Sequence, residues 1–176
     1  MSNGQLQLQD LEADGRKFVV DLHGLAKGFF ELSDESKWQP FQSFSKIPNI
    51  DVNDPNTRFI DLNGDGKAEI LISEETVFTW SPPLGLPGSD SAEVAAKSYD
   101  EEKGPAMLFR DPEQCIFLAD MSGDGMTDIV RIRNGETCYW PNLGFGKFGA
   151  KVNMDYAPVF DNADLFNPSY LHLADI

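Results

Sequence analysis

The sequence predicts an all-β fold, a partial β-propeller of about three blades of antiparallel strands. Two observations lead to this prediction: a short acidic loop recurs along the chain, and short apolar segments flank each copy of it. A repeat of several tens of residues with three or four strands in each copy is typical of propeller blades. A β-sandwich with acidic hairpins is the competing fold, but a sandwich does not require the period.

The acidic loop is clearest at 61–69 (DLNGDGKAE) and at 120–128 (DMSGDGMTD). An eroded copy stands at 10–18 (DLEADGRKF), and residues 173–176 (LADI) match LADM at 118–121, where the copy at 120–128 begins. The first aspartates of successive copies are 51, 59 and 55 residues apart. We therefore expect one domain over 1–176, with blades at about 5–50, 51–110 and 111–165 and the start of a fourth at 166–176.

Each expected blade has one strand before the acidic loop and further strands after it. In the third unit these are 115–119, 129–133 and 137–140, with Asn134-Gly135 as a type I′ hairpin signal. The glycine-rich segment 144–149 is expected to close the blade. The corresponding segments elsewhere are 58–60, 70–72 and 77–80 in the second unit, 18–22 and 28–32 in the first, and 170–174 in the fourth.

Two further features fall inside this pattern. Residues 91–97 are expected to form one or two turns of helix within a loop region. Cys115 and Cys138 fall on the first and third strands of one unit, and two strand spacings of roughly 10 Å are too long for a disulfide. Both cysteines are therefore predicted to be free thiols.

The acidic loop has the spacing by which a tight turn wraps oxygen ligands around a hard cation. Oxygen-bearing side chains stand at loop positions 1, 3, 5 and 9, glycine stands at position 6, and the carbonyl of position 7 can add a ligand. Flexible oxygen geometry and three carboxylates in each loop favour Ca²⁺ over Mg²⁺. The predicted structural Ca²⁺ ligands are Asp61, Asn63, Asp65, Lys67 (carbonyl) and Glu69, and Asp120, Ser122, Asp124, Met126 (carbonyl) and Asp128.

Alternatives to a metal site remain open at this stage. The loops are not EF-hands, because strands rather than helices flank them and position 12 lacks the bidentate glutamate. Asx turns alone would also favour aspartate and glycine in such a hairpin. The first copy has Phe18 at position 9 and therefore lacks one ligand.

Composition restricts the class of partner. The chain of 176 residues has a net charge of −15, which argues against a nucleic-acid partner and suits a cation or a basic protein surface. It contains no apolar run of the ~18 residues that a membrane helix needs. The polar N-terminus is not a Sec-type signal peptide, so export, if it occurs, is expected to use another route.

We expect no enzymatic activity. The two histidines, His23 and His172, form no triad or Cys/His pair with sequence context, and His172 falls within a repeated strand segment. No phosphate-cradling glycine loop is present, since no βαβ pattern surrounds the glycines at 144–146. The paired acids of the loops are better explained by a cation than by acid–base chemistry.

Longer strings around the loops give the chain a resemblance to a known family. From residue 58 onward it resembles the FG-GAP/VCBS-type propeller of the SpvB/TcdB family, which comprises virulence-plasmid protein B and the B component of insecticidal toxin complexes. Residues 10–57 resemble it more loosely, through WQPF at 38–41 and IPNI at 47–50. The strings that carry the resemblance are FIDLNGDG (59–66), DEEKGP (100–105), FLADMSGDG (117–125), IVRIRNG (129–135) and YWPNLG (139–144).

The resemblance implies a secreted, non-enzymatic propeller that docks and gates between the channel component and the payload shell of a toxin assembly. Its partners would be other toxin-complex subunits or the rest of its own propeller, since three blades do not close a ring. Two alternatives stay open: an integrin-like, Ca²⁺-dependent adhesion module for a receptor or glycan, and a nonfunctional fragment.

Overall fold

The fold consists of three antiparallel sheets of four strands each, in a computed structural model that describes residues 6–85, 91–111, 115–160 and 170–173. The first sheet contains β1 (Gln7–Gln9), β2 (Phe18–Asp21), β3 (Gly28–Glu31) and β4 (Gln42–Ser43). The second contains β5 (Thr57–Ile60), β6 (Glu69–Ser73), β7 (Val77–Ser81) and β8 (Glu93–Ala96). The third contains β9 (Ile116–Ala119), β10 (Asp128–Arg133), β11 (Glu136–Trp140) and β12 (Val152–Asn153). The prediction of an all-β fold is confirmed.

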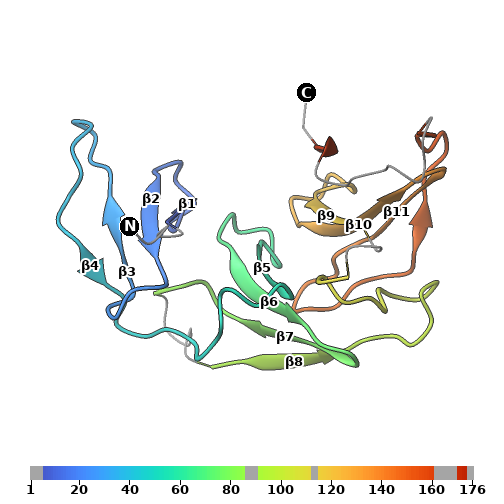
Figure 1. The fold of residues 1–176 in the computed structure, drawn as a ribbon, viewed down its shortest axis with the longest axis horizontal. Coiled ribbons are helices and arrows are strands. Elements are labelled where there is room, and N and C mark those ends of the chain that lie inside the picture. The colour runs from blue at the N-terminus through green and yellow to red at the C-terminus, as the bar shows by residue number, and fades with distance from the viewer. Residues whose placement is uncertain (1–5, 86–90, 112–114, 161–169, 174–176) are drawn as a thin grey trace.

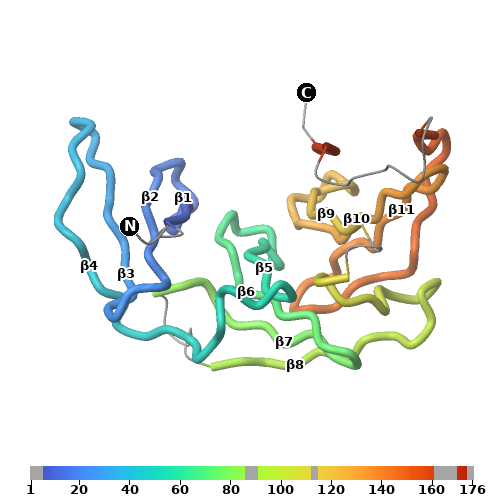
Figure 2. The backbone as a smooth tube through the Cα atoms, in the orientation of Figure 1, coloured from blue at the N-terminus to red at the C-terminus, as the bar shows by residue number. Residues whose placement is uncertain are grey.

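The three sheets lie side by side around an open arc (Figure 1). In each sheet the strands follow chain order, so every connection within a sheet is between neighbouring strands. The first strands, β1, β5 and β9, lie toward the inside of the arc, and the later strands lie progressively further out. The smooth backbone trace shows the chain returning from the outside of one sheet to the inside of the next (Figure 2).

All three sheets share one strand register. Leu8 pairs with Val19 in the first sheet, Phe59 with Ile70 in the second, and Leu118 with Ile129 in the third. The second residue of each pair then pairs with Phe30, Ser81 and Trp140, respectively. Within each sheet, the paired positions on the first, second and third strands are therefore spaced eleven residues apart in the sequence. The repeat seen in the sequence is therefore also a repeat of hydrogen-bonded register, which fixes which side chains share a face.

Each sheet has two faces, which we call forward and rear. The forward face carries Val20 in the first sheet and Leu71 in the second, and the rear face carries Ile70 in the second and Ile129 in the third. The forward face of the first sheet packs on the rear face of the second in a cluster that includes Phe18, Val20, Leu22, Phe59 and Ile70. The forward face of the second sheet packs on the rear face of the third in a larger cluster that includes Leu71, Phe78, Trp80, Leu118, Ile129 and Trp140.

The two buried tryptophans reach the larger cluster from opposite sheets. Trp80 pairs with Leu71 across β6 and β7, so it points forward from the second sheet. Trp140 pairs with Ile129 across β10 and β11, so it points to the rear from the third sheet. Trp80 stands one place earlier in its repeat than Trp140, and a shift of one residue in a strand changes the face.

Three expected elements differ from the observed ones. Residues 91–97 do not form helical turns, because Glu93–Ala96 is the outer strand β8 and pairs with β7. The segment 144–149 is a tight turn, in which Gly144, Phe145 and Gly146 all have positive φ, and the strand that closes the third sheet is β12. Residues 170–173 form no strand; a first strand requires a second strand as its partner, and no such strand pairs with them within the described residues.

The ranges expected for the first three units, 5–50, 51–110 and 111–165, each contain one of the sheets, and most of the range 166–176 lies outside the described residues. Cys115 and Cys138 are free, as predicted, and both are buried. Cys115 lies directly before β9 rather than within it.

Candidate functional site

The three acidic loops lie at the same place in each sheet, where they join its first strand to its second. The aspartate at loop position 1 organises each loop by accepting backbone N–H groups. In the second sheet, Asp61 accepts from Gly64 (2.7 Å) with one carboxylate oxygen and from Gly66 (2.8 Å) with the other. Asp120 repeats both bonds with Gly123 (2.7 Å) and Gly125 (2.9 Å). The loops therefore hold their shape through hydrogen bonds of their own.

These bonds also explain the acidity of the Asp120 carboxylate. The backbone N–H of Gly125, assisted by that of Gly123, holds the pKa of Asp120 below its usual value. Donors that point at a carboxylate favour its charged form. Gly66 and Gly125 have φ of +82° and +88°, which agrees with the role predicted for glycine at position 6.

The acid at loop position 9 points into the base of the hairpin. Glu69 is buried and accepts the N–H of Leu62 (2.8 Å) and the side-chain amide of Asn63 (3.0 Å). Asp128 is fully buried and accepts the N–H groups of Met121 (2.9 Å) and Ser122 (3.0 Å). Burial raises the pKa of Glu69, because its hydrogen bonds offset only part of the desolvation. Both acids therefore stabilise the loop by hydrogen bonds from its buried side.

The acids at loop position 5 are exposed. Asp65 accepts the N–H of Lys67, and Asp124 accepts that of Met126, each at 2.9 Å and through one carboxylate oxygen. At position 3, Asn63 accepts the N–H of Asp65 (2.9 Å). No carbonyl of Lys67 or Met126 is seen to accept a bond within the described residues.

The ten predicted ligands are only partly arranged as a cation site requires. The position-1 and position-9 carboxylates of both loops are engaged by N–H groups. Within the described part of the chain, no three His, Cys, Asp or Glu side chains converge closely enough to hold a metal ion. In the observed conformation the residues fit a cation only in part, and the position-5 acids face solvent most freely.

Neighbouring loops contact each other along the inside of the arc. The N–H of Thr127 in the third loop donates to the carbonyl of Asp61 in the second (3.0 Å). The side-chain amide of Asn142, at the end of β11, donates to the same carbonyl (3.3 Å), and its backbone N–H donates to Asp128 (2.7 Å). A Cβ added to Gly66 would lie 2.8 Å from the Cβ of Ala13 in the first loop. The loops therefore form a joined rim that couples adjacent sheets.

Lys97, which lies outside the predicted loops, occupies a polar site next to the larger core cluster. Its ammonium group donates to Ser73 Oγ (2.7 Å) and to the carbonyls of Met107 (2.8 Å) and Glu74. It also lies 4.3 Å from the centroid of the Phe78 ring. Burial lowers the pKa of Lys97 to about 8. Lys97 continues beyond β8 the alternation of buried side chains that includes Ala95, a pattern that is visible only in the structure.

Arg131 links the segment 100–105 to the third sheet. Its guanidinium is buried, pairs with Glu101 (3.0 Å) and Glu136 (2.8 Å), and lies over the Trp140 ring. The indole N–H of Trp140 donates to the carbonyl of Glu101 (2.8 Å). The string at 100–105 therefore acts as a strap across the third sheet, a role that its sequence alone did not indicate.

Among the described residues, no helix is long and apolar enough to cross a membrane. No family model and no curated protein matches the chain.

Proposed function

We propose that the chain is a non-enzymatic protein-interaction module, formed by three blades of an integrin-like β-propeller from a toxin-complex B-type protein. The observation that carries the proposal is the shared register of the three sheets and their forward-on-rear packing around an arc. Propeller blades are four-stranded sheets arranged radially in this manner. The toxin-complex assignment rests on the sequence strings, including the strap at 100–105.

In this proposal the inner rim of acidic loops is the docking surface. Asp14, Asp65 and Asp124 occupy the same position in the three loops, and all three are exposed. The chain carries a net charge of −15, so a partner with a basic surface would be steered toward it. The partner would be another toxin-complex subunit, and the protein would leave the cell by a non-Sec route.

Ca²⁺ is the proposed structural ligand of the loops at 61–69 and 120–128. Asp65 and Asp124 use one carboxylate oxygen each within the loop, and the second oxygen accepts no bond within the described residues. A bound cation would neutralise part of the charge that the acidic rim concentrates. The hydrogen bonds of Asp61 and Asp120 would keep the loop folded before the cation binds.

Binding measurements test the docking role. The purified chain is titrated against the isolated channel and shell components of a toxin complex, and we expect binding that weakens as salt is added. The double variant Asp65→Lys, Asp124→Lys should weaken this binding by ~tenfold or more, equivalent to about 1.4 kcal/mol. A matched double variant, Asp34→Lys and Glu75→Lys, changes the same number of exposed acids away from the loops and should bind normally.

Failure to bind either component would reject the docking proposal. Calcium-dependent binding to glycans or to receptor ectodomains, without binding to toxin components, would support the adhesion alternative instead.

A further inference from the structure

We propose that two copies of this chain associate head to tail, with the forward face of the third sheet of one copy packed on the rear face of the first sheet of the other. The inference concerns self-association and goes beyond the docking role. It extends the packing rule that the chain already uses twice, between its first and second sheets and between its second and third.

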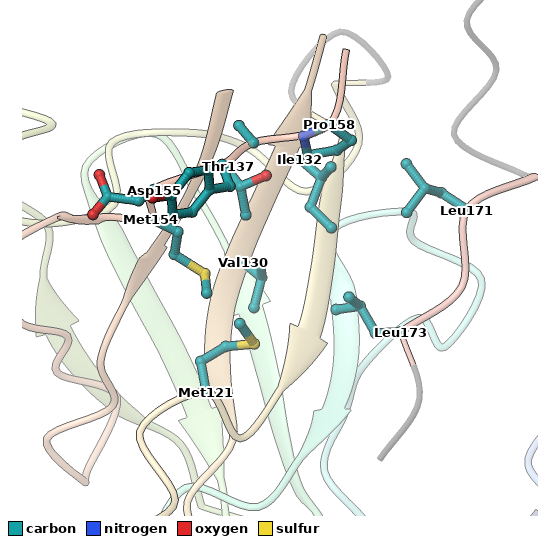
Figure 3. A pocket seen from close by; sticks show the side chains of 11 residues that line it. Met121, Val130, Ile132, Thr137, Met154, Asp155, Pro158, Leu171 and Leu173 are labelled. Carbon is teal, nitrogen blue, oxygen red and sulfur yellow. The ribbon is translucent and has the colours of Figure 1, made fainter. Parts of the chain in front are cut away.

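The forward face of the third sheet is covered, over the described part of the chain, by irregular segments of its own chain and not by a sheet, and Val130 and Ile132 are 0% and 4% exposed there. Val130 and Ile132 from β10 and Thr137 from β11 line an apolar cavity of about 270 Å³ on this face. Figure 3 shows Leu171 and Leu173 lying opposite these strands, on a segment that forms no strand of its own. In the first two sheets this face is closed by a whole neighbouring sheet. In the part of the chain that the structure describes, no strand closes it here.

The rear face of the first sheet is the complementary open surface. Leu8, Val19 and Phe30 are paired across β1, β2 and β3 and therefore share this face. The Phe41 ring lies 5.2 Å from that of Phe30. Leu8 is 70% exposed and Phe41 is 38% exposed. A contiguous apolar patch of this kind marks a contact surface.

The repeat positions indicate how the forward face of the third sheet and the rear face of the first sheet would meet. Leu8, Phe59 and Leu118 each stand two residues before the first aspartate of an acidic loop. Phe59 packs on the forward face of the first sheet, and Leu118 packs on that of the second. Leu173 has the same spacing from Asp175 and lines the cavity on the third sheet. This face therefore accepts an aliphatic side chain from that position. Leu8 of a second copy, attached to a complete sheet, would take the place of Leu173, and residues 170–173 would move off the face.

The charges at the two open ends are also complementary. Within the chain, Thr127 donates its N–H to the carbonyl of Asp61 in the preceding loop. The residue equivalent to Thr127 in the first loop is Lys17, and the residue equivalent to Asp61 in the third loop is Asp120. Head-to-tail packing would place the exposed Lys17 beside the acidic loop at 120–128 of the other copy. The attraction between these opposite charges favours this pairing of faces.

Two copies would supply six sheets, which lies within the four to eight that close a propeller ring. The first and third sheets lie at opposite ends of the arc (Figure 2). In such a ring the same heterologous contact is made twice.

Sedimentation equilibrium of the full 176-residue chain tests the proposal. We expect the average mass to rise with concentration and to level off at twice the chain mass. Leu8→Glu on the rear face and Met154→Glu at the cavity should each raise the dissociation constant by ~tenfold or more. Leu25→Glu is the control, because Leu25 is fully exposed, lies on neither face and receives the same change in charge. Circular dichroism checks that every variant is folded.

Mixing the variants tests the direction of the contact. Each variant alone has lost both contacts of the ring, whereas one Leu8→Glu chain and one Met154→Glu chain together retain one intact contact. We therefore expect dimer to reappear on mixing. A wild-type chain that stays monomeric at every concentration, or a dimer that neither variant weakens, would overturn the proposal. A dimer that both variants weaken but that mixing does not recover would overturn the head-to-tail arrangement.

Discussion

The side-chain amide of Asn142 donates a hydrogen bond to the backbone carbonyl of Asp61 at 3.3 Å, across 81 positions of the chain. The same amide also donates to the carbonyl of Thr127 (3.1 Å), and the Asn142 side-chain oxygen accepts the N–H of Gly144 (2.8 Å). Because Asn142 is only 1% exposed, water cannot replace these bonds. One buried amide thus couples the third sheet to the acidic loop of the second.

We expect Asn142→Ala to lower the free energy of unfolding by about 2–3 kcal/mol, since it leaves buried carbonyl and N–H groups without partners. Urea denaturation measures this change. Asn49→Ala removes an exposed amide and should change stability by less than about 0.5 kcal/mol. Equal effects of the two substitutions would mean that the coupling contributes nothing.

The contact between the first two loops predicts a difference between two equivalent glycines. Gly66 and Gly125 both stand at loop position 6 with φ above +80°, so alanine at either is strained by about 1 kcal/mol. At Gly66 the new Cβ would also lie 2.8 Å from Ala13, whereas at Gly125 nothing lies within 4 Å. We therefore expect Gly66→Ala to be the more destabilising by about 1 kcal/mol or more in thermal or urea unfolding. The prediction fails if Gly125→Ala costs as much.

The buried ammonium of Lys97 predicts a pH dependence of stability. Its pKa is about 8 in the folded protein and 10.5 when unperturbed, so between these values the unfolded chain binds more protons than the folded one. The contribution of Lys97 to the free energy of unfolding therefore rises as the pH increases from about 8 to about 10.5. Lys97→Met should abolish this contribution, as measured by urea midpoints across the range.

Lys103→Met is the control for Lys97, because the Lys103 side chain is 77% exposed. This variant should retain the rise in stability that the wild-type chain shows. A wild-type pH profile that Lys97→Met does not alter would show that the ammonium keeps an ordinary pKa.

The proposed calcium sites predict a loop-specific stabilisation. Ca²⁺ should raise the melting temperature of the metal-stripped chain, and Asp65→Ala or Asp124→Ala should each reduce that rise by removing one ligand. Asp14→Ala is the matched control, since Asp14 occupies the same position in the loop that lacks an acid at position 9. Calorimetry that detects no binding, together with a melting temperature unaffected by chelator, would rule the sites out.

Much of the fold could be predicted from sequence because the acidic loops mark where first and second strands meet. The strands around 61–69 and 120–128 lie within about two residues of their predicted positions. Elements far from a loop were harder to predict. The outer strand Glu93–Ala96 has small residues and ambiguous local propensity, and only its pairing with β7 makes it a strand. The segment at 170–173 has a strand-like sequence but no described partner strand.

The candidate site was predictable in position but not in detail. Spacing located the loops and the glycines with positive φ, because those depend on local backbone geometry. Spacing did not show that Glu69 and Asp128 turn inward, because burial of a side chain depends on the strands beneath it. Lys97 and Arg131 were missed for a related reason. Their partners, such as Met107 and Glu101, come from connecting segments without a repeated pattern.

The opposite orientation of the two buried tryptophans has a spectroscopic consequence. Trp80 and Trp140 both lie between the second and third sheets, whereas Trp38 in the first unit is 52% exposed. A red shift of the indole emission during unfolding would therefore report almost entirely on the separation of the second and third sheets. Loss of the first sheet alone would be nearly silent in fluorescence, although circular dichroism would still record it.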